Sequence, residues 1–127
     1  MSQLRRDLTL EIKVRSAPNG TIPVLELAGR FDTYEIPIVK EWLSRITSVS
    51  PAQVVINLAK VNFIDSSGLA LLMQGMMHCR QNKGDLHLCD LQEPVRTIFT
   101  LSCLDKTFKV FNDEAEAVAA FNPVYQG

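Results

Sequence analysis

The segment Asp65-Ser66-Ser67-Gly68 holds the residue types with the clearest chemical potential in this chain. It follows a β-rich apolar run and precedes a run with helical periodicity, so it lies where a strand leads into a helix. Taken alone, the four residues fit an ordinary turn with a serine N-cap better than a modified site, because hydroxyls and glycine are common at helix starts. The same serine hydroxyls are also what phosphorylation requires.

A phosphate on Ser66 would be favourable for the helix itself. The dipole and free N–H groups of a helix N-terminus stabilise an anion by about 0.3–1 kcal/mol. The phosphate would also place about −1.5 to −2 charges beside the Asp65 carboxylate. A partner would then have to desolvate neighbouring like charges, and a penalty of only ~2.8 kcal/mol would weaken binding about a hundredfold. Phosphorylation of Ser66 is therefore predicted to alter a docking surface and to leave the fold intact.

The other reactive side chains form no recognisable catalytic or metal-binding pattern. His78 and His87 have no cysteine or carboxylate at ligand spacing. The two common phosphate-binding patterns, Gly-x-x-x-x-Gly-Lys and Gly-x-Gly-x-x-Gly, are missing. Asp65–Gly68 also does not fit the nucleophile elbow Gly-x-Ser-x-Gly. We therefore expect no catalytic residue, no metal and no cofactor. A small α/β enzyme is the alternative, and a deep polar cleft with a perturbed acid–base pair would favour it.

The cysteines Cys79, Cys89 and Cys103 are odd in number, and none has Cys-x-x-Cys spacing. This pattern predicts buried or half-buried thiols in a reducing cytoplasm, and neither a disulfide framework nor a zinc site.

Size and composition indicate one soluble cytoplasmic domain over residues 1–127, with its core at about 8–122. The chain has 127 residues, of which 46% are hydrophobic, so it can bury an ordinary core. Its formal net charge of −1 argues against direct nucleic-acid binding. The first ten residues lack the apolar region of a signal peptide, and no run approaches the ~18 apolar residues of a membrane span. We expect no direct contact with a membrane.

Strands and helices alternate around the serine segment. Asn19-Gly20 predicts a hairpin turn between strands at 8–14 and 22–28, the second ending at Gly29. A helix is predicted from Tyr34, with Thr33 or Asp32 as its N-cap. Further strands are expected at 53–58, 86–89 and 108–111. Further helices are expected from Ser66 or Ser67 to Gly84, from Pro94, and after Asn112 as a cap.

The helix that follows Ser66 has a clear apolar stripe. Its members recur at i, i+3, i+4 and i+7 and are predicted to face the core: Leu69, Leu72, Met73 and Met76. Leu71 lies on the opposite side and is predicted to be exposed, which makes it a candidate anchor for a partner. A lone surface leucine with no role is equally compatible. The expected binding face combines the Asp65–Gly68 turn, the Gly29–Asp32 loop and the outer side of this helix.

The element order β-β-α-β-α-β-α-β-α indicates an α/β fold. Such alternation is typical of a largely parallel mixed sheet, here with an antiparallel hairpin at its N-terminal edge. Periodicity alone does not decide whether the helices cover one face or both.

Three stretches of the chain resemble the STAS family, specifically bacterial anti-sigma factor antagonists. They are Gly29-Arg30-Phe31-Asp32, the run from Val54 to Leu69, and the run from Leu88 to Ser102. With the element order, the likeness covers about residues 8–122. It implies a STAS-like mixed sheet with helices mainly on one face.

The resemblance also implies a phosphorylation-switched interaction domain. The family's phosphorylated serine maps to Ser66. A partner serine kinase, often itself an anti-sigma factor with a histidine-kinase-like ATP-binding domain, would phosphorylate it, and a PP2C-type phosphatase would reverse this. The unphosphorylated form would bind the anti-sigma factor and free the sigma factor. Asp32 matches a family position near the site that would help kinase docking. The expected partner-binding residues are Asp32, Asp65, Ser67, Gly68 and Leu71.

Two residues depart from the family pattern. Ala70 stands where many members have glycine, and Cys103 stands where a glycine usually follows Ser102. Cys103 is expected to reshape that turn, and neither change removes Ser66. The alternative function within this fold is a constitutive scaffold or ligand-sensing module without a phosphoserine switch, as in transporter-linked STAS domains.

Overall fold

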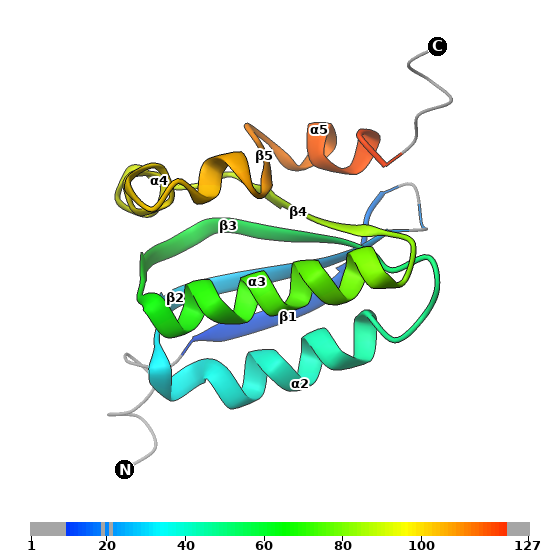
Figure 1. Cartoon of the computed structure of the whole chain (residues 1–127), viewed down its shortest axis with the longest axis horizontal. Coiled ribbons are helices and arrows are strands. Elements are labelled where there is room, and N and C mark those ends of the chain that lie inside the picture. The colour runs from blue at the N-terminus through cyan, green and yellow to red at the C-terminus, as the bar shows by residue number, and fades with distance from the viewer. Residues whose placement is uncertain (1–9, 19, 21, 122–127) are drawn as a thin grey trace.

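Five strands form a single mixed sheet in the order β1-β2-β3-β4-β5 (Figure 1). This computed structural model describes residues 10–18, 20 and 22–121. The strands are β1 (Glu11–Ser16), β2 (Pro23–Phe31), β3 (Gln53–Ile64), β4 (Asp85–Cys89) and β5 (Lys109–Phe111). The helices are α2 (Ile36–Ile46), α3 (Ser66–Gln81), α4 (Glu93–Leu101) and α5 (Glu114–Ala119), with 3₁₀ turns η1 (Thr33–Glu35) and η2 (Leu104–Lys106).

The strand pairing confirms the predicted α/β class. β1 pairs antiparallel with β2, whereas β2, β3, β4 and β5 pair in parallel. The antiparallel pair is the predicted N-terminal hairpin. Within its turn, Gly20 has a φ of 83°, while Asn19 and residues 8 and 9 lie outside the described residues.

The two faces of the sheet have separate apolar clusters. Alternate residues of a strand point to opposite faces, and Ile56 of β3 belongs to the larger cluster whereas its neighbour Val55 belongs to the smaller one. Buried residues of α2, α3 and α4 join the larger cluster, among them Val39, Leu72 and Phe99. Among the helices that the structure describes, α5 alone contributes to the smaller cluster, with Ala117 as its buried member. The expected arrangement, with helices mainly on one face, is therefore confirmed.

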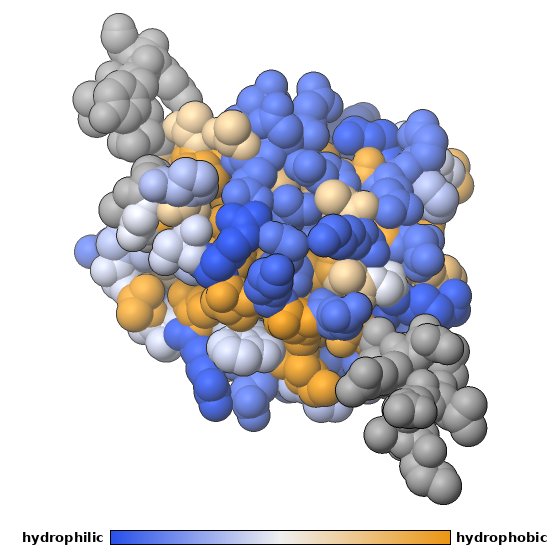
Figure 2. Space-filling view, turned by 180° about the vertical axis from the view of Figure 1, so that it is seen from behind, coloured by the Kyte–Doolittle hydropathy of each residue, from blue (hydrophilic) through white to orange (hydrophobic). Residues whose placement is uncertain are grey.

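Figure 2 shows the molecule from the side opposite to Figure 1. Polar residues dominate the upper part of this face, and apolar side chains gather in a band across the lower half, toward the side where α2 lies in Figure 1. β1 and α2 hold several half-buried apolar residues that pack against the core: Ile12, Val14, Trp42 and Ile46.

Several element ends differ from the sequence predictions. β2 continues to Phe31 instead of ending at Gly29, because Gly29 adopts a φ of 114° beside a register shift and the strand resumes pairing after it. β3 likewise extends to Ile64, well past the predicted 53–58. The cap of α5 is Asp113, whose side chain accepts from the Glu116 N–H, and not Asn112.

The ends of α3 and α4 share one backbone conformation. α3 ends at Gln81, before the predicted stop at Gly84, and Lys83 has a φ of 66°. After α4, Cys103 has a φ of 60°. Left-handed residues of this kind terminate helices and are usually glycine. Cys103 therefore occupies a turn position whose backbone suits glycine.

Candidate functional site

The site lies where two neighbouring parallel strands end. Phe31 of β2 pairs with Ile64 of β3, and the Asp65 N–H donates to the Phe31 carbonyl at 3.2 Å. Asp32 and Asp65 therefore follow adjacent strands at the carboxyl edge of the sheet, where α/β folds present functional groups. The chain enters η1 after Asp32. At the same edge of the sheet, β3 leads into α3 (Figure 1), with Asp65 between them.

Asp65 is the N-cap of α3, which corrects the expectation of a serine cap. Its Oδ1 accepts from the Gly68 N–H at 3.0 Å. Its Oδ2 accepts from the Thr33 N–H at 3.0 Å and from the Thr33 hydroxyl at 3.1 Å. One carboxylate thus caps the helix and ties it to the start of η1.

The Asp65 carboxyl is kept ionised by these donors. Partial burial acts to raise its pKa, but the hydrogen bonds from Gly68, Thr33 and Ser67 outweigh that effect, so the pKa lies below its usual range. Hydrogen bonds to a carboxylate favour its charged form. Asp65 is therefore a fixed negative charge at the start of α3.

The two serines of the segment have different surroundings. Ser67 is half-buried, and its Oγ lies 3.0 Å from the Thr33 Oγ1. Ser66 is the first residue of α3 and is exposed. Within residues 10–18, 20 and 22–121, its hydroxyl has no hydrogen-bond partner among the side-chain contacts of the turn. Ser66 is therefore exposed to solvent, whereas the Ser67 hydroxyl is hydrogen-bonded to Thr33.

Asp32 shapes the adjoining turn. Its Oδ1 accepts from the Tyr34 N–H at 3.1 Å, which caps η1. Its Oδ2 lies 3.7 Å from the Arg30 Nε, and the Arg30 guanidinium stacks 4.0 Å above the Phe63 ring centroid. Asp32 is linked to the serine turn through its neighbour Thr33.

The expected exposure of Leu71 is wrong. Leu71 is only 5% exposed, and it lines a groove of about 190 Å³ between α2 and α3 together with Leu43 and Gly75. The prediction failed because α3 packs against both the sheet and α2. The buried face of α3 is therefore wider than the single apolar stripe seen in the sequence. Gly68 is also buried. Of the expected site residues, the structure brings Asp32, Asp65, Ser66, Ser67 and Gly68 together and turns Leu71 inward.

Two exposed apolar residues next to the turn were missed. Tyr34 is 86% exposed and Ile38 is 51% exposed. Tyr34 lies in η1, and Ile38 lies in the first turn of α2, whose residues Val39 and Leu43 are buried. Exposed apolar side chains are a common mark of an interaction surface, so these two residues are candidates for contact with a partner. Thr33 was predicted only as a possible cap, because its partners are more than thirty residues away in sequence.

The histidines lie away from this turn and have structural partners. The Nδ1 of His78 lies 2.8 Å from the Thr47 Oγ1, and the Nδ1 of His87 lies 2.8 Å from the Ala117 carbonyl. No group of three or more His, Cys, Asp or Glu in the described part of the chain is arranged to hold a metal ion. Across these same residues, no helix has the length and apolar character needed to cross a membrane.

All three cysteines are free thiols. Cys79 and Cys89 are buried, as predicted, but Cys103 is exposed because the left-handed turn after α4 lies at the surface. Burial raises the pKa of the Cys79 thiol to about 12. The buried thiols are therefore in their protonated, unreactive form at neutral pH.

Comparison with known proteins gives the family. The putative anti-sigma factor antagonist BtrV of Bordetella bronchiseptica is 36% identical over 54% of this chain and 60% of its own length. An anti-sigma factor antagonist from Mycobacterium paratuberculosis has a similar structure, with a TM-score of 0.79 over 89% of this chain and 94% of that one, at 23% identity. The Bacillus cell fate determinant SpoIIAA, solved in its phosphorylated form, superimposes with a TM-score of 0.65 over 87% of this chain and 98% of that one, at 20% identity. The sequence model of the STAS domain matches residues 13–117, and the chain therefore belongs to the STAS domain family.

Proposed function

We propose that this chain is an anti-sigma factor antagonist whose binding is switched by phosphorylation of Ser66. The unphosphorylated domain binds an anti-sigma factor and relieves the inhibition of a sigma factor. The same partner is a serine kinase with a histidine-kinase-like ATP-binding domain, and a PP2C-type phosphatase restores the binding form. In this proposal the chain is a substrate and a binding partner, not an enzyme.

The observation that carries the proposal is the capping of α3 by Asp65. Because the carboxylate takes the capping role, the Ser66 hydroxyl is left exposed at the first position of the helix. In the transfer step, the Ser66 Oγ attacks the γ-phosphorus of ATP, the bond from that phosphorus to the bridging oxygen breaks, and ADP leaves. The hydroxyl proton passes to a base of the kinase. The phosphatase reverses the modification by attack of water on phosphorus, with the serine oxygen as leaving group.

The phosphate would stand beside a carboxylate that is already ionised. Asp65 keeps its negative charge because four hydrogen bonds hold its pKa down. The free N–H groups at the start of α3 favour the phosphate, so the helix is preserved. A partner surface that fits the neutral serine would have to desolvate two adjacent anions after phosphorylation. This supports a switch in binding rather than in folding.

The docking surface proposed here combines the serine turn with the outer side of η1 and α2. Tyr34 and Ile38 replace Leu71 as its apolar anchors. Both side chains are exposed, and Tyr34 directly follows Thr33, whose hydroxyl donates to Asp65. Exposed aromatic residues of this kind are enriched among the residues that dominate binding energies.

The site assignment is tested by phosphorylation in vitro. The wild-type chain and Ser66→Ala are incubated with ATP and the serine kinase encoded nearest to this chain in the source genome, and the products are mapped by mass spectrometry. We expect one phosphate on Ser66 and none on Ser66→Ala. A phosphate that persists in Ser66→Ala would remove the assignment.

The docking surface is tested by calorimetry with the same kinase. Tyr34→Ser and Ile38→Ser should each weaken binding at least about tenfold, which corresponds to ~1.4 kcal/mol. Leu101→Ser is the matched control, because Leu101 is 79% exposed at the end of α4. If Tyr34→Ser and Ile38→Ser bind the kinase as tightly as Leu101→Ser and the wild-type chain do, this surface is ruled out. If Ser66→Asp binds as tightly as wild type, the domain is a constitutive scaffold.

A further inference from the structure

We propose that Thr33 determines which serine accepts the phosphate, by holding the Ser67 hydroxyl and the Asp65 carboxylate in one hydrogen-bonded chain. The inference rests on the proposed function, since it concerns the choice between two adjacent serines. Ser66 and Ser67 carry the same functional group, so any preference of the kinase must come partly from their surroundings.

The direction of this hydrogen-bonded chain follows from the carboxylate. Asp65 is ionised and can only accept hydrogen bonds. The Thr33 hydroxyl must therefore donate its proton to the Asp65 Oδ2, at 3.1 Å. Its oxygen is then free to accept, and the Ser67 hydroxyl, 3.0 Å away, is the donor. The order is Ser67 to Thr33 to Asp65.

The proton of the Ser67 hydroxyl is consequently held in a hydrogen bond to Thr33. To attack a phosphorus atom, it has to turn away from Thr33 and give its proton to a base of the kinase. That turn breaks the hydrogen bond and leaves Thr33 without its donor, and donors and acceptors linked in series strengthen one another. Ser66 has no comparable bond to break within the turn, and it is exposed where Ser67 is half-buried.

Thr33 reaches the serine turn because of the sheet. β2 and β3 run in parallel, with Phe31 opposite Ile64, so the residues that follow the two strands meet at one edge. The Thr33 N–H adds a second bond to the same Asp65 oxygen, at 3.0 Å. Backbone and side chain of Thr33 together fix the carboxylate, and the carboxylate fixes the hydroxyl that holds Ser67.

The test is site-resolved phosphorylation of Thr33 variants with the same nearest-encoded serine kinase and ATP. Thr33→Val removes the hydroxyl and nearly keeps the shape, whereas Thr33→Ser keeps the hydroxyl. Thr97→Val is a control on the exposed side of α4. Loss of one neutral hydrogen bond should raise the ratio of phosphate on Ser67 to phosphate on Ser66 about fivefold in Thr33→Val, which corresponds to ~1 kcal/mol. Thr33→Ser and Thr97→Val should keep the wild-type ratio.

An unchanged ratio in Thr33→Val would overturn the role of Thr33 while leaving Ser66 as the switch. If the wild-type chain carries no phosphate on either serine, the proposed function itself fails. A second measurement needs no kinase. Carbon-13 NMR titration of the Asp65 carboxyl should give a higher pKa in Thr33→Val than in wild type, because a donor to the charged form is lost. An identical pKa in the two proteins would contradict the hydrogen-bonded chain.

Discussion

Gly68 shows how a single residue keeps the serine turn in place. A Cβ at this position would lie 2.8 Å from the Ile64 Cγ1 and 2.9 Å from the Phe31 carbonyl oxygen. The carbonyl belongs to the backbone of β2 and cannot rotate away. The absence of a side chain therefore lets the first turn of α3 approach the ends of both strands, which is what brings Asp65 within reach of Thr33.

Gly68→Ala should accordingly destabilise the domain by about 1–3 kcal/mol, the usual cost of forcing atoms into a packed site. Gly75→Ala is the comparison, because its Cβ would meet only side-chain atoms of Leu86 and Leu43, at 3.2 and 3.3 Å. There the gain in helix propensity offsets much of the crowding, and the change should stay within about 1 kcal/mol. Urea denaturation measures both. A smaller loss for Gly68→Ala than for Gly75→Ala would contradict this packing argument.

Cys103 adopts a left-handed backbone conformation that its side chain disfavours. Its φ of 60° is unfavourable for any residue with a Cβ. Cys103→Gly should therefore raise the free energy of unfolding by about 1 kcal/mol. Cys103→Ala keeps the Cβ and should leave stability nearly unchanged. Thermal unfolding distinguishes the two, and equal midpoints would show that the turn is not strained.

Two errors at the residue scale have physical causes. Aspartate and serine are about equally good N-caps, so local sequence cannot say which residue caps a helix that begins Asp-Ser-Ser. The deciding contacts come from Thr33, in a distant segment. Leu71 was wrongly predicted to be exposed because helical periodicity identifies only one apolar stripe. That α2 covers a second side of α3 depends on tertiary packing, which the periodicity does not reveal. The place of Asp65-Ser66-Ser67-Gly68 where a strand leads into a helix was predictable and is confirmed.

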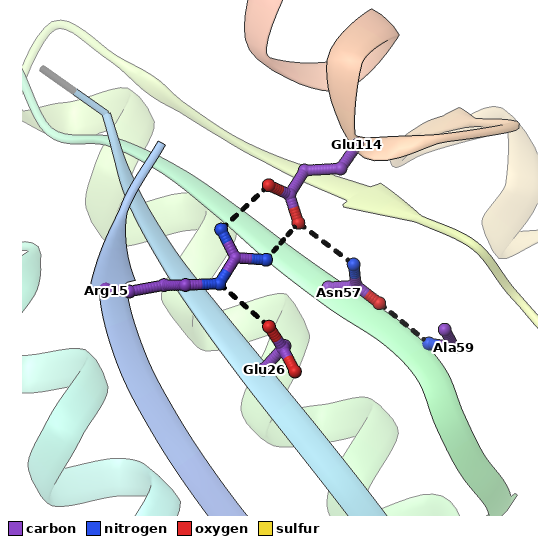
Figure 3. A network of polar contacts seen from close by, with 5 residues as sticks. All are labelled: Arg15, Glu26, Asn57, Ala59 and Glu114. Atoms are coloured by element: carbon purple, nitrogen blue, oxygen red, sulfur yellow. Dashed lines mark hydrogen bonds and ion pairs between the residues drawn. The ribbon is translucent and has the colours of Figure 1, made fainter. Parts of the chain in front are cut away.

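At the scale of elements, α5 is held to the sheet by a polar clamp (Figure 3). Glu114 binds the Arg15 guanidinium through both carboxylate oxygens, at 2.6 and 2.9 Å, and also accepts from the Asn57 amide at 3.0 Å. The Arg15 Nε bonds to Glu26 at 2.8 Å. The hydrogen bond from Arg15 is the largest cause of a pKa of Glu114 below its ordinary value. The clamp joins α5 to β1, β2 and β3.

Glu114→Gln should destabilise the domain by about 1–2 kcal/mol, because a bidentate charged pair is lost at a partly buried site. The matched control is Glu41→Gln. Glu41 pairs with Arg45 at 3.6 Å, but both side chains are more than half exposed, so its loss should cost less than about 0.5 kcal/mol. Chemical denaturation of the two variants measures the difference. Equal effects would mean that the clamp contributes no more than a surface pair.

α5 also covers His87, which is 2% exposed and stacks on Phe121 with ring centroids 3.7 Å apart. Burial is the main reason that its pKa lies below the ordinary 6.5. The neighbouring Asp85, 3.9 Å from its Nε2, is already paired with Arg80 and Lys109. The folded state thus binds fewer protons at His87 than the unfolded state does.

The free energy of unfolding should therefore be highest above about pH 6.5, where His87 is neutral in both states, and should decrease as the pH drops below that value. Urea midpoints at pH 7.5 and 5.5 test this, and Glu114 stays charged across that window because its pKa is lowered from 4.5. His87→Phe removes the titrating group and keeps an aromatic ring against Phe121, so the difference between the two midpoints should shrink. A wild-type midpoint that does not change with pH would contradict the assignment.

Most elements were predictable from periodicity, since each helix has an apolar stripe and each strand a β-rich run. Their ends were less so. β2 passes Gly29 because pairing with β3 resumes after the irregularity, and such long-range pairing leaves no local signal. The place of α5 on the opposite face was not predictable either, because it depends on Arg15, ninety-nine residues away from Glu114 in the chain.

In the molecule as a whole, the proposed switch lies at one edge of the sheet, and the clamp between Arg15 and Glu114 lies on the face opposite to α2 and α3. The switch should change the surface around Ser66, Asp65 and Tyr34 without changing the core. Phosphorylation should therefore change partner binding without destabilising the fold.

The most direct test compares the unphosphorylated domain with the domain phosphorylated on Ser66, in calorimetric titrations against the nearest-encoded anti-sigma factor kinase. The thermal midpoint of each form is measured in parallel. We predict that phosphorylation weakens binding at least about a hundredfold, equivalent to ~2.8 kcal/mol, while the midpoint does not fall and rises by no more than about 4 °C. Equal affinity of the two forms, or a loss of affinity that comes with a collapse of the thermal midpoint, would show that Ser66 does not switch the docking surface.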